Sequence, residues 1–213
     1  MKQLVLIIFL LIVGTTKGQS SSKLNQDFWL GYGVKFKVFK KMEMSFQAEQ
    51  RFGVDDFEIE RNLIEVGLKR KLSKLSQLGL LYRTTWEDGE DYRLRRYAGH
   101  YKLNILKGNF KFSNQLGFQF DVRDYTGETK SHIRDKIAIK YDYFKKVKPY
   151  FQYDFSFRFD NKNYIDNNRF SIGAKVRLKK NVKLKLFVRF DHQSNRQNPE
   201  QELIFGTRLA LKI

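Results

Sequence analysis

The residues best suited to chemistry are lysines and arginines that recur at every second position of long segments. Lys183, Lys185 and Arg189 share one parity within one segment, and Lys175 and Arg177 do so in the segment before it. Alternate residues of a β-strand point to the same face of a sheet, so this spacing gathers the cations on one surface. Clustered ammonium and guanidinium groups bind anions or pair with carboxylates.

We expect this polar surface to line the interior of a closed sheet. The lumen-lining candidates are Arg51, Arg83, Arg96, His100, Lys102, Asp121, Lys136, Lys140, Asp154, Lys175, Arg177, Lys185, Arg189 and Arg208. The lipid-facing candidates, on the opposite face, are Phe110, Phe112, Phe118, Phe120, Phe155, Phe157, Leu184 and Leu186. Two interpretations stay open. Ion pairs plug the interior and satisfy charges that cannot face lipid, or a basic constriction favours anions, as Lys and Arg rings do in anion-selective pores.

The elements that must position these residues are strands. The stretch "NFKFSNQLGFQFDVR" at 109–123 places apolar, mostly aromatic residues on one face and polar residues on the other. The same period of two recurs in about eleven segments of about 10 to 15 residues. Strands of globular proteins average about 5 to 6 residues, whereas about 9 to 11 tilted residues cross a bilayer. The segment lengths therefore favour a membrane barrel with its aromatic face toward lipid.

The links between segments alternate in kind. Short basic links, such as "KK" at 40–41 and "KG" at 107–108, alternate with longer and more acidic ones, such as "EDGEDY" at 87–92. Short periplasmic turns alternating with longer outside loops are typical of a transmembrane barrel. Single-chain bacterial barrels have an even strand number. We therefore predict an all-β, antiparallel up-and-down transmembrane barrel of about 12 strands, with 10 as the alternative; residues 20–27 supply the missing strand or thread the lumen.

The first twenty residues, "MKQLVLIIFLLIVGTTKGQS", predict a secretory signal peptide. Lys2 precedes an unbroken apolar run, and small residues flank a cleavage site before Gln19. The run is too short for a spanning helix, although an uncleaved anchor is the alternative. We expect residues 1–18 to be removed and residues 19–213 to form one barrel domain in the outer membrane of a Gram-negative cell.

Composition excludes several classes of function. The chain has no cysteine, which excludes disulfides, thiolate metal sites and a cysteine nucleophile. The net charge of +18 invites a nucleic-acid partner, but periplasmic turns would meet lipid phosphates instead. The acidic clusters (Asp55, Asp56, Glu58 and Glu60; Glu87, Asp88, Glu90 and Asp91) lack the spacing of a calcium loop. We expect no cofactor, no metal and no nucleic acid, with outer-membrane lipids and lipopolysaccharide as the partners.

Enzymatic activity would need a serine beside one of three histidines, His100, His132 and His192. Ser131 precedes His132 but points to the opposite face of the strand, and Ser194 lies two residues from His192 in a link. Neither matches a lipase motif. An enzyme is therefore less favoured than a structural barrel, or a narrow channel or binding barrel with a charged lumen. A lipid-modifying enzyme of the Ser/His type and a soluble periplasmic barrel that binds an apolar ligand stay as alternatives.

Two stretches also resemble a known family. They are "QDFWLGYGVKFKVFKKMEMSFQAEQRF" at 26–52 and "IEVGLKRKLSKLSQLGLLYR" at 64–83. Both are similar to segments of an uncharacterised family, a domain of unknown function found in outer-membrane β-barrel proteins of Bacteroidetes-type bacteria. The resemblance implies an outer-membrane barrel and implies no catalytic residues.

Overall fold

Eleven β-strands make up most of the chain in a computed structural model that describes residues 24–55, 57–89, 93–160, 163–195 and 199–213. The strands are β1 (Leu24–Phe39), β2 (Met42–Gly53), β3 (Ile59–Lys71), β4 (Ser76–Glu87), β5 (Arg93–Lys107), β6 (Phe110–Arg123), β7 (Thr129–Tyr141), β8 (Val147–Arg158), β9 (Tyr164–Arg177), β10 (Val182–Gln193) and β11 (Gln201–Lys212). The all-β prediction is confirmed. Among the described residues, no helix has the length and apolar character needed to span a membrane.

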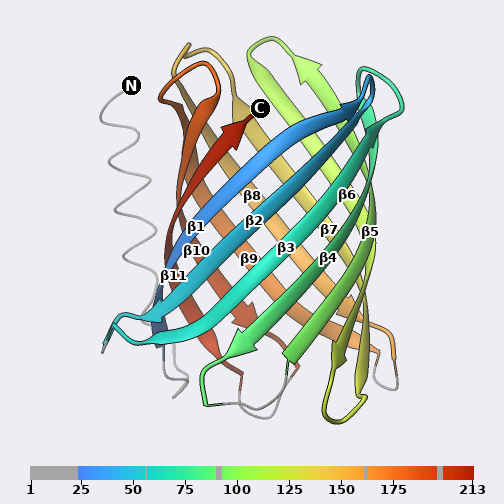
Figure 1. The fold of residues 1–213 in the computed structure, drawn as a ribbon, viewed down its shortest axis with the longest axis vertical. Coiled ribbons are helices and arrows are strands. Elements are labelled where there is room, and N and C mark those ends of the chain that lie inside the picture. Colours follow the sequence, from blue (N-terminus) through green and yellow to red (C-terminus); the bar gives the residue numbers. More distant parts are fainter. Residues whose placement is uncertain (1–23, 56, 90–92, 161–162, 196–198) are drawn as a thin grey trace.

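The strands form one closed barrel in which sequential neighbours are antiparallel (Figure 1). The barrel closes where β1 pairs with β11, and this pair is parallel, with Leu24 opposite Gln201 and Lys35 opposite Lys212. An odd number of alternating strands requires such a seam, because the first and last strands run in the same direction. The described strand number, eleven, lies between the predicted ten and twelve.

The parallel seam corrects the argument that the strand number must be even. It also accounts for part of the segment at 20–27, for which we expected a further strand or a piece of chain in the lumen. Leu24–Asp27 is the beginning of β1 itself, paired with both β2 and β11 at its last residue. Residues 20–23, like the predicted signal peptide at 1–18, lie outside the described residues.

The two ends of the barrel differ in their links. The links 40–41, 72–75, 108–109, 142–146 and 178–181 gather at one end, called here the turn end, together with the last residue of β11 (Figure 1). The described residues of the links 54–58, 88–92, 124–128, 159–163 and 194–200, together with the start of β1, gather at the loop end. The tightest turns are built from two residues; Gly108 adopts a φ of 57°, which glycine tolerates without strain.

The inner face of the barrel is mostly polar and its outer face is mostly apolar, which is the reverse of the arrangement in a soluble protein. Only five large apolar or aromatic side chains are buried in the described residues: Trp29, Leu63, Tyr150, Phe187 and Ile204. Twelve buried residues are polar or charged, among them Glu49, Asp121 and Asp154. The exposed apolar side chains instead cover the outer surface, in the manner of a membrane barrel. A soluble barrel with an apolar interior does not fit this arrangement.

Candidate functional site

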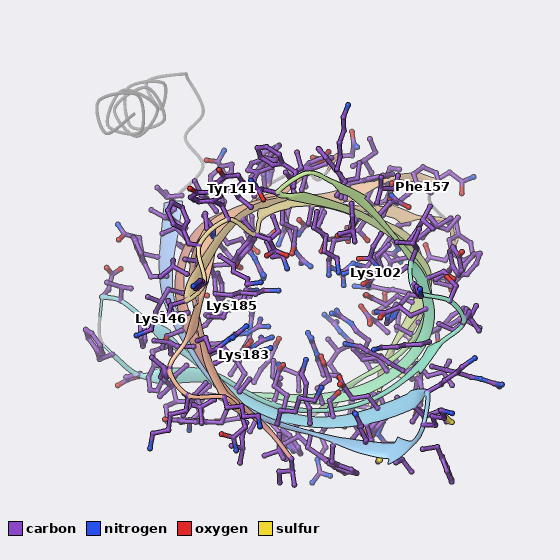
Figure 2. The ribbon with its side chains drawn as sticks, turned by 90° about the horizontal axis from the view of Figure 1, so that it is seen from above. Lys102, Tyr141, Lys146, Phe157, Lys183 and Lys185 are labelled. Carbon is purple, nitrogen blue, oxygen red and sulfur yellow. The ribbon has the colours of Figure 1, made fainter. Side chains whose placement is uncertain are left out.

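The interior of the barrel is a charged lumen, and it is the candidate functional site. Figure 2 looks along the barrel and shows nitrogen- and oxygen-bearing side chains, among them the labelled Lys102 and Lys185, gathered inside the ring of strands. Nine of the fourteen lumen candidates line a cavity of about 430 Å³: Arg51, Arg83, Arg96, His100, Lys136, Asp154, Lys185, Arg189 and Arg208. The other five share the inward parity of these strands: Lys102, Asp121, Lys140, Lys175 and Arg177.

The lipid-facing candidates lie on the outer surface. Phe110, Phe112, Phe118, Phe120 and Leu186 are exposed there. Phe155, Phe157 and Leu184 have the same outward parity and are partly covered by neighbouring side chains. The outer surface is not wholly apolar. Asn114 donates a hydrogen bond of 2.5 Å from Nδ2 to Oδ1 of Asp135, two outward side chains midway along β6 and β7.

Arginine–carboxylate pairs between neighbouring strands dominate the middle of the lumen. Arg96 on β5 makes a bidentate pair with Asp121 on β6, with Nε–Oδ1 at 2.7 Å and Nη2–Oδ2 at 3.0 Å. Arg83 on β4 donates from Nε to Oε2 of Glu65 on β3 at 3.1 Å. Bidentate guanidinium–carboxylate contacts are the strong form of ion pair, so these pairs hold their side chains in defined positions.

The pairs continue around the barrel on β7 to β10. Asp154 accepts from Arg134 (Nη2–Oδ2, 2.7 Å) and also pairs with Lys136 (Nζ–Oδ2, 3.3 Å). Arg169 donates from Nε to Oδ2 of Asp191 at 2.6 Å. In each case the partners sit on adjacent strands. The charges therefore neutralise each other along the wall and not across the lumen.

One pair reaches across the seam. Arg208 on β11 pairs with Glu49 on β2, and Arg51 also pairs with Glu49 at 3.2 Å. The intervening strand β1 carries Gly31 beneath the arginine, and a Cβ at this position would lie only 3.1 Å from Arg208 Nε. The glycine thus leaves the space through which Arg208 crosses β1, which ties the two sides of the seam together.

Toward the turn end, the lumen changes to lysines without carboxylate partners. In the part of the chain that the structure describes, six lysines toward this end form no ion pair: Lys35, Lys69, Lys102, Lys175, Lys183 and Lys185. Lys140 and Lys148 pair with Asp142, and Lys212 pairs with Glu43. Lys175 interacts electrostatically with Lys35, Lys69 and Lys102, which come from three other strands. The lumen therefore passes from a belt of neutralised pairs to a zone of uncompensated positive charge.

The sequence prediction missed an aromatic cluster inside the lumen. Trp29, Tyr150, Phe187 and Ile204 are buried together on the β1, β8, β10 and β11 wall. Each ring lies under a cation: the Arg51 guanidinium is 3.7 Å from the Trp29 ring centre, and Lys185 Nζ is 4.7 Å from that of Phe187. Such contacts hold the cations over the rings. The inward parity of Trp29, between outward Phe28 and Leu30, was the available signal.

The histidines do not form a serine-dependent catalytic site. His132 is buried, and its Nε2 lies 3.3 Å from Oδ2 of Asp166. His100 packs in the lumen over Gly79, and His192 stacks on Phe190. No hydrogen bond between a serine hydroxyl and any of the three histidines is found among the described residues. Nothing in this geometry therefore favours the Ser/His enzyme.

Ion pairs hold acidic side chains at the loop end. Glu87 pairs with Arg61 at 3.2 Å, and Arg158 donates from Nε to Oδ1 of Asp160 at 2.6 Å, which lowers the pKa of the Asp160 carboxyl. Within the ranges that the structure describes, no group of three or more acidic or histidine side chains could hold a metal ion. Of the acidic positions singled out in the sequence, 56, 90 and 91 lie outside those ranges.

Comparison with solved structures finds two porins among its matches. The structure is similar to one described as a NanC porin structure in a rhombohedral crystal form, with a TM-score of 0.52 and 10% identity, covering 82% of this chain and 94% of that one. It also matches an anion-selective porin from Comamonas acidovorans with a TM-score of 0.41 and 13% identity, covering 81% of this chain and 54% of that one. At such identity the first match shows a shared porin-type fold.

Comparison of the sequence with curated proteins finds no match. A family model described as a protein of unknown function, DUF2490, matches residues 26–202. This range contains both stretches on which the resemblance was based and includes β2 to β10 completely. The resemblance to a family of unknown function is confirmed: the chain belongs to the DUF2490 family.

Proposed function

We propose that this protein is a narrow outer-membrane channel whose lumen favours small anions. The observation that carries the proposal is the excess of positive charge toward the turn end, where six lumen lysines form no ion pair among the described residues. Rings of Lys and Arg side chains favour anions in pores because they lower the electrostatic energy of an anion in the constriction. The outward apolar surface supports a membrane location, with lipids and lipopolysaccharide as its surroundings.

The direction of the ion pairs favours a channel over a plugged barrel. Plugging pairs would join opposite walls, but the pairs Arg83–Glu65, Arg96–Asp121 and Arg169–Asp191 each join neighbouring strands. Their side chains therefore lie along the wall. Figure 2 shows the described side chains arranged around a central space along the barrel axis. A barrel of this strand number has room for a small aqueous path beside its side chains.

Planar-bilayer recording tests the proposal. The purified protein is reconstituted between two KCl solutions of unequal concentration, and the reversal potential reports which ion passes. We expect channel activity with a reversal potential close to the equilibrium potential of chloride. Lys102→Glu, which places a carboxylate among the turn-end lysines, should move that potential toward potassium.

Lys146→Glu is the matched control, because Lys146 lies in the link 142–146 outside the strands (Figure 2). It makes the same charge change and should leave the potential close to that of the native protein. Heat-dependent mobility in detergent gels confirms that each variant is folded. Folded protein that forms no channel, or one that passes potassium in preference to chloride, contradicts the proposed function.

A further inference from the structure

We infer that the β8–β11 wall of the lumen carries a binding site for a tetrahedral oxyanion of the phosphate class. Its donors are the ammonium groups of Lys175 and Lys185 and the Tyr150 hydroxyl. The inference rests on the proposed function in that it names the class of anion that the channel would admit.

Four cations stand side by side in this wall. Cross-strand pairing places Lys148 opposite Lys175, Lys175 opposite Lys185, and Lys185 opposite Arg208, on four consecutive strands. We call these four residues the basic row. Like charges directly opposite each other destabilise a sheet. An anion bound over the basic row would relieve this repulsion. The row therefore has the charge distribution expected of an anion-binding site that is missing its anion.

The outer members of the basic row are already neutralised. Lys148 Nζ lies 3.1 Å from Oδ1 of Asp142, and Arg208 pairs with Glu49. The two central members, Lys175 and Lys185, have no carboxylate partner within the described chain. The uncompensated charge is therefore concentrated at the centre of the row, on two neighbouring strands.

An unused hydrogen-bond donor lies beside these two lysines. The Tyr150 hydroxyl is buried and has no hydrogen-bond partner in the part of the chain that the structure describes. Tyr150 as a whole is only 7% exposed. A buried polar group without a partner destabilises the state in which it is buried. An acceptor with several oxygen atoms would satisfy this hydroxyl and both ammonium groups together.

The aromatic rings of Tyr150 and Phe187 lie beneath the two central lysines and position them. Lys185 Nζ lies 5.2 Å from the Tyr150 ring centre and 4.7 Å from that of Phe187, and Lys175 Nζ lies 5.6 Å from that of Tyr150. Across the strands β8 to β11, Tyr150 lies opposite Gly173, and Phe187 lies between Gly173 and Gly206. A Cβ at Gly206 would lie 2.1 Å from Phe187 Cζ. The rings therefore fit only because the glycines leave room, and they cannot shift far.

The aromatic rings also limit the class of ligand that the site can bind. Trp29, Tyr150 and Phe187 are between 5% and 7% exposed, because cations cover their faces. No ring face of this cluster is free to stack on a planar or apolar solute. Lysine ammonium groups act as compact point charges that suit phosphate oxygens. A phosphate near neutral pH carries between one and two negative charges and several acceptor oxygens, which matches two unpaired cations and the unused Tyr150 hydroxyl.

Isothermal titration calorimetry of the purified barrel with inorganic phosphate tests the site. Detergent, pH 8 and the chloride concentration are held constant, so that non-specific screening does not change. We expect one saturable site. Lys175→Gln and Lys185→Gln should each weaken binding by about tenfold or more, and Tyr150→Phe, which removes only the hydroxyl oxygen, by about tenfold.

Lys146→Gln is the control for a change of one charge outside the lumen and should bind phosphate like the native protein. Each variant must first show native heat-dependent mobility. Absence of saturable phosphate binding, or equal binding by the folded Lys175→Gln/Lys185→Gln double variant, overturns the site. Anion-selective conductance with no phosphate binding would leave the channel proposal standing and overturn this one, whereas phosphate binding without conductance would support the site and contradict the channel.

Discussion

Replacing Asp154 with asparagine removes the carboxylate that holds two lumen cations. Asp154 is 4% exposed, and its oxygens lie 2.7 Å from Arg134 Nη2 and 3.3 Å from Lys136 Nζ. Asparagine keeps the shape of the side chain and one acceptor oxygen, but not the charge. Both cations would then be uncompensated in the wall.

The size of the effect follows from the burial of the three groups. Removing one partner of a buried ion pair costs about 3–5 kcal/mol. The side chains of Arg134 and Lys136 are 22% and 32% exposed, so lumen water solvates part of the freed charge. We therefore expect Asp154→Asn to lower the free energy of unfolding by about 3 kcal/mol, the lower end of this range. Urea unfolding in detergent, followed by tryptophan fluorescence, measures the change.

The same variant has a second readout, because it adds one net positive charge to the lumen. Its reversal potential in a KCl gradient should move further toward chloride. Asp135→Asn is the matched control on the outer surface, where Asp135 has a single hydrogen bond from Asn114. We expect it not to lower the free energy of unfolding, because a neutral amide faces lipid more favourably than a carboxylate does, and to leave selectivity unchanged. Equal stability of the two variants would refute the assignment of Asp154 as the anchor of Arg134 and Lys136.

Two further substitutions test the packing of the lumen and the turn end. Gly206→Leu should lower the free energy of unfolding by about 1–3 kcal/mol, because its side chain overlaps the Phe187 ring; adding Phe187→Ala should recover part of this loss in urea unfolding, and strictly additive losses would contradict the contact. At the turn end, burial raises the pKa of Asp142, but the ammonium groups of Lys140 and Lys148 outweigh it and hold that pKa below its usual value. The carboxylate therefore stabilises the fold above the usual carboxyl pKa and loses this effect as the pH falls through the lowered value. Asp142→Asn should unfold at lower urea than the native protein at pH 7, and this difference should shrink as the pH falls below the usual carboxyl pKa. A difference that does not change with pH would contradict the ion pairs.

The period of two was enough to predict the strands and their faces. The stretch at 109–123 became β6, Phe110–Arg123, with its phenylalanines outward. The prediction from alternation succeeds because a membrane barrel imposes opposite polarity on alternate residues over the whole length of each strand. Asn114 and Asp135 show the limit of the rule, since one outward polar residue can pair with another on the next strand.

The seam and the contents of the lumen depend on pairing between distant strands, which no local pattern encodes. The parallel contact of β1 with β11 joins the two extremes of the barrel sequence. Likewise, Phe187 can face inward only because Gly206 lies opposite it, 19 positions later in the chain. Which arginine meets which carboxylate is set by the same register. Alternation could therefore predict that the lumen is charged, but not where its charge is neutralised.

The parallel seam also determines how the barrel can be rearranged. In a barrel with an even strand number, the first and last strands meet as an antiparallel pair, and a short loop can join them in a circular permutant. Here the start of β1 and the end of β11 lie at opposite ends of the barrel. A joining peptide would have to run the length of the paired segment, roughly 40 Å at about 3.3 Å per residue. The addition or loss of whole hairpins also preserves the odd count, so a relative with an even number of strands must differ by a single strand.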